Sequence, residues 1–306
     1  MTGLLREADL PTAVNVSQLT GRGFENEISL ARLDDGQQVV LRRWSEPRQP
    51  ERLRAEFLEA HGVPAPRLLA ANRHASLYPF VSGELLGDLI ETGCCSQSQW
   101  RMVGAAFRRV HDIAFPALVK GDLEPDRLFL RPVDPVAQMH GWIDESAPGL
   151  RRLAPDSLQH LPALHEIVDK AAESLRTAGT SLLHGDISMW NIIVGDGDVS
   201  LIDWDYPCVG DPAMEVALID KHASLFNGYG LDEAFFDGYG QGRAEPNTSL
   251  HRVVQTMRWA ASSDWRSFDE LHLPADVHRR TKDWLSVLLV HVGQLPAHIE
   301  RLRTLL

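Results

Sequence analysis

Four polar residues whose types could carry out chemistry together lie within residues 184–203: His184, Asp186, Asn191 and Asp203. A carboxylate and an amide oxygen are hard ligands of the kind that Mg²⁺ accepts, with water and phosphate oxygens completing its shell. A further carboxylate beside them can accept the proton of an attacking hydroxyl and orient it toward phosphorus. The set therefore indicates phosphoryl transfer. A metal-dependent phosphohydrolase with His184, Asp186 and Asp203 as ligands is an alternative that remains open.

The local sequence around these residues predicts a β-hairpin that brings two of them together. Two β-branched runs, residues 192–194 and 199–202, flank the turn Gly195-Asp196-Gly197-Asp198. Because the outer ends of a hairpin meet, Asn191 and Asp203 are expected side by side. Asp186 would lie on the loop that enters the same end.

The remaining chain divides into a strand-rich part and a helical part. Short β-prone runs and one helix are expected at residues 14–19, 27–33, 38–42, 51–60 (the helix), 68–71 and 76–81, with a hairpin turn at Asp34-Asp35-Gly36. Helical apolar spacing follows at residues 97–113, 161–178, 250–261 and 276–304. The Pro-rich residues 124–135 read as an irregular connector. Ser82-Gly83 is the predicted boundary, which gives an N-terminal unit at 1–81 and a C-terminal unit at 82–306.

The motif His184-Gly185-Asp186, followed by Asn191 and then by Ile202-Asp203-Trp204-Asp205, resembles the aminoglycoside phosphotransferase and choline kinase family. The fold of that family is similar to that of protein kinases. The resemblance implies an α+β fold of two lobes, a small antiparallel-sheet N-lobe that binds ATP and a larger, mainly helical C-lobe. It also implies transfer of the γ-phosphoryl of ATP to a hydroxyl, with Asp186 as base, Asn191 and Asp203 holding Mg²⁺, His184 bracing the loop and Glu215 structural.

The resemblance extends to the expected nucleotide site. Residues 20–27 are similar to the family's glycine-rich turn over the ATP phosphates, where Gly21 and Gly23 allow backbone N–H groups to approach closely and Asn26 follows. Residues 78–84 resemble the hinge between the lobes. There, the backbone of Phe80 and Val81 is expected to hydrogen-bond the adenine.

One position departs from the kinase pattern. A lysine on the third strand usually neutralises the α and β phosphates and pairs with a helix glutamate, but this sequence has no lysine before Lys120. Arg42 occupies the matching position, and a guanidinium does not reproduce the reach of an ammonium. Glu56 is the expected helix partner, with Glu51 as the fallback. The exchange leaves a second reading open, an ATP-binding module that is impaired in catalysis.

Charge supplies the only sequence argument about the acceptor. The 30 Lys and Arg against 42 Asp and Glu give a net charge of −12, which disfavours nucleic acid as a general partner. Residues 184–245 hold twelve of the acids and two of the bases, and therefore −10 of that total. Acid beyond the catalytic residues, from Asp205 to Glu270, would favour a cationic hydroxylated acceptor such as an aminoglycoside, an amino sugar or choline. Antibiotic resistance is one option among these.

The N-terminus and the cysteines bear on location. Residues 1–10 contain Arg6, Glu7 and Asp9 and no apolar run, so we expect neither a signal peptide nor a membrane anchor. Three cysteines, two of them adjacent, form no disulfide framework, and a cytoplasmic protein is the simplest expectation.

Protein kinase activity is disfavoured because no Ala-Pro-Glu-like segment follows Asp203.

Overall fold

The computed structural model describes residues 1–19, 26–243, 245–262 and 285–306. The N-lobe consists of a five-stranded antiparallel sheet in the order β1-β2-β3-β5-β4 with two helices. Its elements are α1 (Thr2–Glu7), β1 (Ala13–Gln18), β2 (Asn26–Leu33), β3 (Gln38–Trp44), α2 (Arg52–Ala60), β4 (Ala70–Ala71) and β5 (Ala75–Pro79). The expected meander, its Asp-Gly turn and the helix are therefore confirmed.

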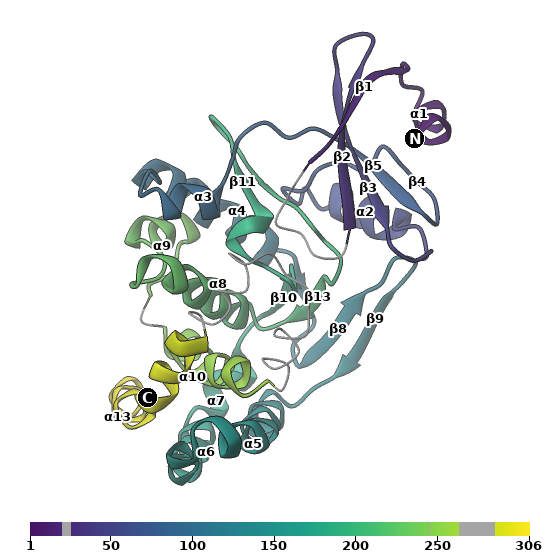
Figure 1. Ribbon diagram of the computed structural model, residues 1–306. Coiled ribbons are helices and arrows are strands. Elements are labelled where there is room, and N and C mark those ends of the chain that lie inside the picture. Colours follow the sequence, from purple (N-terminus) through teal and green to yellow (C-terminus); the bar gives the residue numbers. More distant parts are fainter. Residues whose placement is uncertain (20–25, 244, 263–284) are drawn as a thin grey trace.

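The period of two along β3 places Arg42 on the sheet face opposite the N-lobe core. Val39 and Leu41 are buried in a small apolar core with Leu4, Leu5 and Leu77. Alternate residues of a strand point to opposite faces, so Arg42 extends from the other face. That face is turned toward the C-lobe (Figure 1). The strand thus places the guanidinium of Arg42 between the two lobes.

The chain crosses to the C-lobe between β5 and β6 (Glu84–Leu85) and joins the hairpin there. β6 pairs with β11 (Ile192–Val194), which pairs in turn with β12 (Val199–Leu201). Gly83 lies at φ +147°, and a Cβ on it would stand 2.6 Å from the carbonyl oxygen of Val194. Only glycine suits such a close approach in that conformation. The crossing is consequently fixed to the predicted hairpin, while the boundary at Ser82-Gly83 stays a prediction.

The C-lobe is built from helices around two apolar cores. Its helices are α3 (Leu86–Glu91), α4 (Gln97–His111), α5 (Pro135–Leu153), a 3₁₀ turn (Pro155–His160), α6 (Leu161–Lys170), α7 (Ala172–Thr177), α8 (Pro212–Asn227), α9 (Glu233–Tyr239), α10 (Pro246–Ala261) and α13 (Leu295–Leu305). One core lies between α4, α8, α9 and the hairpin, and the other joins α5, α6, α10 and α13. The helix expected at 161–178 is divided at Ala171 into α6 and α7. Of the helix expected at 276–304, residues 276–284 lie outside the described residues.

A second sheet in the C-lobe corrects one prediction. Strands β7 (Ala114–Phe115), β10 (Thr180–Leu183), β13 (Cys208–Gly210), β8 (Val119–Leu123) and β9 (Leu128–Pro132) lie in that order. Residues 124–135 are therefore no irregular connector, because they contain the turn and second strand of a hairpin. The hairpin reaches the N-lobe, where the N–H of Arg54 on α2 donates to the carbonyl of Pro125 at its tip, 3.4 Å away (Figure 1).

Candidate active site

The loop that carries Asp186 is anchored through its first residue, His184. This side chain is fully buried at the end of β10, and its Nε2 lies 2.8 Å from the carbonyl oxygen of Ile202. Its ring packs on Trp204, with 4.4 Å between the centroids. His184 therefore ties the loop to the strand that leads into Asp203. Its Nε2 is therefore engaged by the protein itself.

Gly185 and Glu215 form a second anchor. Gly185 adopts φ +82°, and its N–H donates to Oε1 of Glu215 at 3.0 Å, while Oε2 lies 3.0 Å from Nε2 of His111. Burial raises the pKa of the Glu215 carboxyl, but the hydrogen bond and charge of His111 outweigh it and hold the pKa below its usual value. Glu215 is thus an ionised, buried group that fixes the backbone just before Asp186.

We predict that Gly185→Ala disrupts the loop. A Cβ there would lie 1.9 Å from the carbonyl oxygen of Tyr206, and the positive φ already disfavours a side chain. The expected results are a loss of unfolding free energy of at least about 1–3 kcal/mol in chemical denaturation and a loss of activity. Gly197→Ala in the hairpin turn, where a Cβ would meet no atom within 4 Å, should change neither. Equal stability of the two variants would contradict the anchoring role of Gly185.

The hairpin brings Asn191 and Asp203 together as the turn predicts. The N–H of Ile202 donates to the carbonyl of Asn191 at 2.8 Å, one residue before Asp203. The amide nitrogen of Asn191 donates to the backbone carbonyl of Asp186 at 2.9 Å, which turns its Oδ1 away from that bond. Asp203 has φ +66°, an uncommon conformation for a side chain other than glycine. One amide oxygen and one carboxylate thus lie close to an exposed Asp186.

These oxygens fit a hard divalent cation. Oδ1 of Asn191 has no donor function, and Asp203 keeps a second carboxylate oxygen beyond the one that Arg42 contacts. The Asp203 side chain is 38% exposed, so water and phosphate oxygens can reach it. Mg²⁺ is typically bound in this way, through one or two protein oxygens with the rest of the shell left to water and phosphate.

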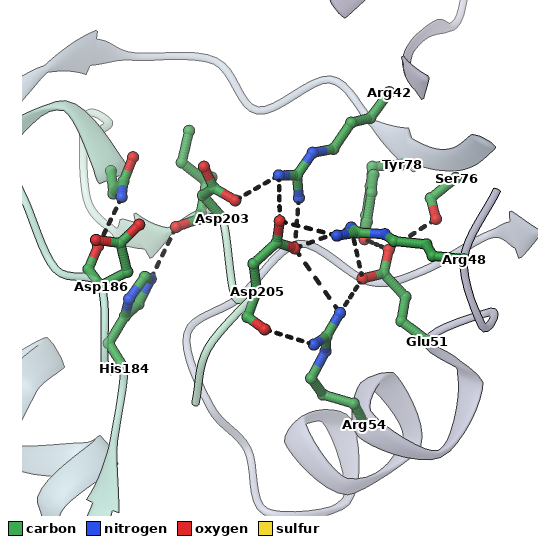
Figure 2. A network of polar contacts seen from close by, with 12 residues as sticks. Arg42, Arg48, Glu51, Arg54, Ser76, Tyr78, His184, Asp186, Asp203 and Asp205 are labelled. Atoms are coloured by element: carbon green, nitrogen blue, oxygen red, sulfur yellow. Dashed lines mark hydrogen bonds and ion pairs between the residues drawn. The ribbon is translucent and has the colours of Figure 1, made fainter. Parts of the chain in front are cut away.

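Arg42 links this site to the N-lobe through two carboxylates (Figure 2). Its Nη2 lies 2.7 Å from Oδ1 of Asp203 and 2.7 Å from Oδ2 of Asp205, and its Nη1 lies 2.9 Å from Oδ1 of Asp205. Burial lowers the pKa of Arg42, but the two carboxylates raise it by more. Arg42 is therefore a permanently charged group in contact with the residue expected to hold the metal.

Two more arginines surround Asp205, whose side chain is only 5% exposed. Arg48 binds it through both terminal nitrogens at 3.1 and 3.0 Å, and Nη1 of Arg54 donates to its backbone carbonyl at 2.9 Å. The guanidinium of Arg48 also stacks on Trp44, 3.3 Å from the ring centroid. We call Arg42, Arg48, Arg54, Asp205 and Glu51 the interlobe cluster, because Asp205 belongs to the C-lobe and the others to the N-lobe.

The glutamate in this cluster is Glu51, the fallback of the two candidates. It is 5% exposed at the start of α2, contacts Arg54 and Tyr78, and accepts a hydrogen bond from Ser76 at 2.7 Å. Glu56 lies on the exposed side of α2. Arg54, Ser76 and Tyr78 contact Glu51 and hold it in the interlobe cluster. The ion pairs of Arg42 itself are with Asp203 and Asp205, so a helix glutamate as its partner stays a prediction.

The other expected nucleotide contacts are described only in part. Gly21 and Gly23 lie outside the described residues, as does the side chain of Asn26. The N–H of Phe80 donates to the carbonyl of Gln38 at 3.0 Å and continues the β3–β5 pairing. That N–H is therefore unavailable to adenine, and the carbonyl of Phe80 and the backbone of Val81 stay the predicted contacts.

Sequence reasoning missed the role of Asp205, Arg48 and Arg54. The signal was present as an acid two residues after Asp203 and a run of arginines before and within residues 51–60. Pairing between segments more than 150 positions apart depends on how the lobes meet. No local pattern encodes that arrangement.

A comparison with protein-family models finds one that matches residues 17–283, described as the phosphotransferase enzyme family. The chain belongs to this family. The match includes the loop of Asp186, the hairpin and Arg42, and the chain is accordingly a phosphotransferase. No curated protein matches the chain.

Solved structures show the same fold at low sequence identity. A choline/ethanolamine kinase family protein from Mesorhizobium loti is 15% identical with a TM-score of 0.65, and the match covers 99% of this chain and 98% of that chain. A choline kinase from Cryptosporidium parvum is 13% identical (TM-score 0.61, 95% and 92% covered). The complex of gentamicin with APH(2")-IIa is 16% identical (TM-score 0.58, 96% and 94% covered). The two-lobed, kinase-like α+β fold expected from the sequence is confirmed. None of the described helices has the length and apolar content needed to cross a bilayer.

Proposed function

We propose that this phosphotransferase moves the γ-phosphoryl group of ATP to a hydroxyl of a small molecule, with Asp186 as the base. The observation that supports this most strongly is the meeting of Asp186, Asn191 and Asp203 at one end of a hairpin, beside a buried arginine. In-line transfer requires a carboxylate for the hydroxyl and positive charge for the phosphates, and this site provides both.

Each side chain has a distinct part in this proposal. Asp186 is exposed, so an acceptor hydroxyl can reach its carboxylate and transfer its proton there as the oxygen attacks phosphorus. Asn191 and Asp203 would hold Mg²⁺, which when bound neutralises phosphate charge. Arg42 stands where it can both neutralise Asp203 and reach the phosphates. Backbone groups of Phe80 and Val81 would orient the adenine.

The phosphohydrolase alternative loses its proposed ligand set. Its metal would need His184, but Nε2 of that ring contacts the carbonyl of Ile202, and the remaining ring nitrogen, Nδ1, is buried. In the described part of the chain, no group of three or more His, Cys, Asp and Glu is arranged to hold a metal ion. Transfer to an acceptor is therefore the better-supported reaction.

The acceptor's charge is less well supported than the acid content suggests. Asp220 is 4% exposed and is paired with Arg243 and Arg252 at 3.1 and 2.6 Å. Asp232 caps α9, and Asp237 faces Arg101 at 3.6 Å. Asp264, Asp269 and Glu270 lie outside the described residues. A cationic acceptor now rests mainly on the structural neighbours, since choline and gentamicin are cations.

The decisive assay measures ADP release with and without acceptors, in wild type and Asp186→Ala. Hydroxylated cations, neutral sugars and hydroxy acids should each be offered at saturating ATP. We expect at least one to raise turnover in wild type only. If the wild type binds ATP and no acceptor raises turnover above that of the variant, the chain is an ATP-binding module.

We predict that Arg42→Ala weakens ATP binding more than Arg42→Lys does. Lysine keeps the charge but cannot bridge Asp203 and Asp205 with a planar fork. Loss of one charge-assisted hydrogen bond corresponds to about 1.5–3 kcal/mol, or roughly tenfold or more in affinity. Titration calorimetry with Mg-ATP measures this, with thermal unfolding to confirm that each variant is folded.

Arg43→Ala is the matched control, because Arg43 is the next residue of β3 and its ion pair within the described part of the chain is an exposed one with Glu27. It should bind ATP as wild type does. Equal affinity of wild type, Arg42→Lys and Arg42→Ala would show that Arg42 does not replace the usual lysine.

A further inference from the structure

A cavity of about 240 Å³ opens in the C-lobe between the β8–β9 hairpin, β13 and helices α5, α7, α8 and α10. It is somewhat smaller than pockets for drug-sized ligands, which span roughly 300–1,000 Å³, and suits a metabolite. Met139, Trp142 and Leu175 form an apolar part of its lining. The cavity thus has the size and the apolar wall of a small-molecule site.

Its location is next to the catalytic loop. Cys208, which lines the cavity, pairs with Leu183 across β13 and β10. Its Sγ would lie 3.4 Å from a Cβ placed on Gly185, the residue that precedes Asp186. Burial raises the pKa of this thiol to about 12, so Cys208 is neutral and adds no charge to the wall.

Two cations line the cavity at directly opposed positions. Lys120 on β8 and Arg131 on β9 are cross-strand partners, and both belong to the lining. In the described part of the chain, neither has a carboxylate within 4.0 Å. Arg131 is exposed and Lys120 is half-buried. Like charges in directly opposed positions destabilise a hairpin, so an anion bound at this pair would relieve their repulsion. An anion between the two side chains would satisfy both.

A buried histidine provides an independent indication of a ligand. His251 on α10 is 3% exposed and lines the cavity, and its Nε2 lies 3.1 Å from Oδ2 of Asp211. Its Nδ1 is buried and has no hydrogen-bond partner among the described residues. A buried polar atom without a partner is costly. Because Nδ1 is itself buried, the ring would have to rotate slightly before Nδ1 could meet a hydroxyl or acid group in the cavity.

The charges of the lining favour an anion over a cation. Asp211 is engaged by His251 and by the N–H of Ala213. Asp122 is the other acid in the lining, so the two cations outnumber the one acid that has no such partners. We propose that this cavity binds a small organic anion through Lys120 and Arg131, and that this anion is part of the hydroxylated acceptor. The second half of this statement rests on the proposed phosphotransferase function.

The binding half is tested without ATP by ligand-observed NMR. The probes are glycerate, gluconate and glycerol phosphate, each compared with its neutral counterpart, glycerol or sorbitol. We expect at least one anion to bind wild type, and the double variant Lys120→Ala/Arg131→Ala to bind it roughly tenfold more weakly or worse. The variant should be at least as stable as wild type, because a like-charge pair has been removed. The control is Lys170→Ala/Arg109→Ala, which removes two exposed cations outside the cavity lining.

The acceptor half is tested by ATP-dependent phosphorylation of the same compounds, with choline and gentamicin alongside. We expect a hydroxy acid to be phosphorylated, with KM raised at least tenfold in the double variant and kcat changed much less. If no anion binds, or if the double variant binds it as well as wild type, the cavity assignment is overturned. Anion binding without phosphorylation, or phosphorylation of choline or gentamicin at equal rates by both proteins, overturns the acceptor half alone. Failure of wild type to bind ATP contradicts the proposed function and leaves the cavity assignment standing.

Discussion

Asp186→Asn is expected to lower kcat by about 10²–10⁴ and to leave ATP affinity unchanged, because the variant loses the general base but no nucleotide contact. Asparagine is nearly isosteric with aspartate, and the backbone carbonyl of residue 186 still accepts from Asn191. The anchors of the loop, His184 and Glu215, are untouched. Acceptor-dependent ADP release gives kcat, and calorimetry gives the ATP affinity.

Asp196→Asn serves as the control, since Asp196 is exposed in the turn of the same hairpin. It should retain wild-type kcat. Retention of wild-type kcat by Asp186→Asn would remove this residue from the role of base. Loss of ATP binding in that variant would instead show that Asp186 is a nucleotide ligand.

Asp205→Asn is expected to lower the free energy of unfolding by about 3–5 kcal/mol, the range for breaking a buried ion pair by removal of one partner. The Asp205 carboxylate receives four hydrogen bonds from Arg42 and Arg48. Without its charge, the guanidinium groups of the interlobe cluster are left with an excess of positive charge in a buried place. Urea denaturation measures the loss.

The control is Asp237→Asn, which breaks an exposed pair with Arg101 and should change the free energy of unfolding by about 1 kcal/mol or less.

The difference between wild type and Asp205→Asn should also depend on pH. Burial raises the pKa of the Asp205 carboxyl, but Arg48 and Arg42 lower it by more than burial raises it. The folded-state pKa therefore lies below its usual value. A lowered pKa stabilises the fold above the unfolded value of about 3.9, and this contribution disappears as the pH falls through the folded value. A difference that stays constant from pH 7 to below pH 4 would contradict this assignment.

The sequence could predict what local patterns determine. The β-branched runs around residues 195–198 and the converging ends of a hairpin were enough to place Asn191 beside Asp203. The Asp-Gly turn likewise predicted the N-lobe meander. The juxtaposition of Asn191 and Asp203 could therefore be predicted from spacing, whereas their roles and that of Asp186 came from the family resemblance.

The rest depends on contacts between segments far apart in the sequence. Glu51, and not Glu56, joins the interlobe cluster because Ser76 and Tyr78 of β5 lie beside it in the fold. Only its third partner, Arg54, is a near neighbour in the sequence. Asp220 suggested a cationic ligand, but in the folded chain Arg243 and Arg252 pair with its carboxylate and neutralise it. The opposed positions of Lys120 and Arg131 could not be predicted either, because the prolines of residues 124–135 did not indicate the β8–β9 hairpin.

The most direct test of the central claim follows phosphorus by ³¹P NMR in a mixture of wild-type protein, Mg-ATP and candidate acceptors. We expect a new phosphate monoester that appears together with ADP in equal amounts, and no such signal with Asp186→Asn. ADP with free inorganic phosphate, formed at the same rate whether or not an acceptor is present, would contradict transfer to a hydroxyl.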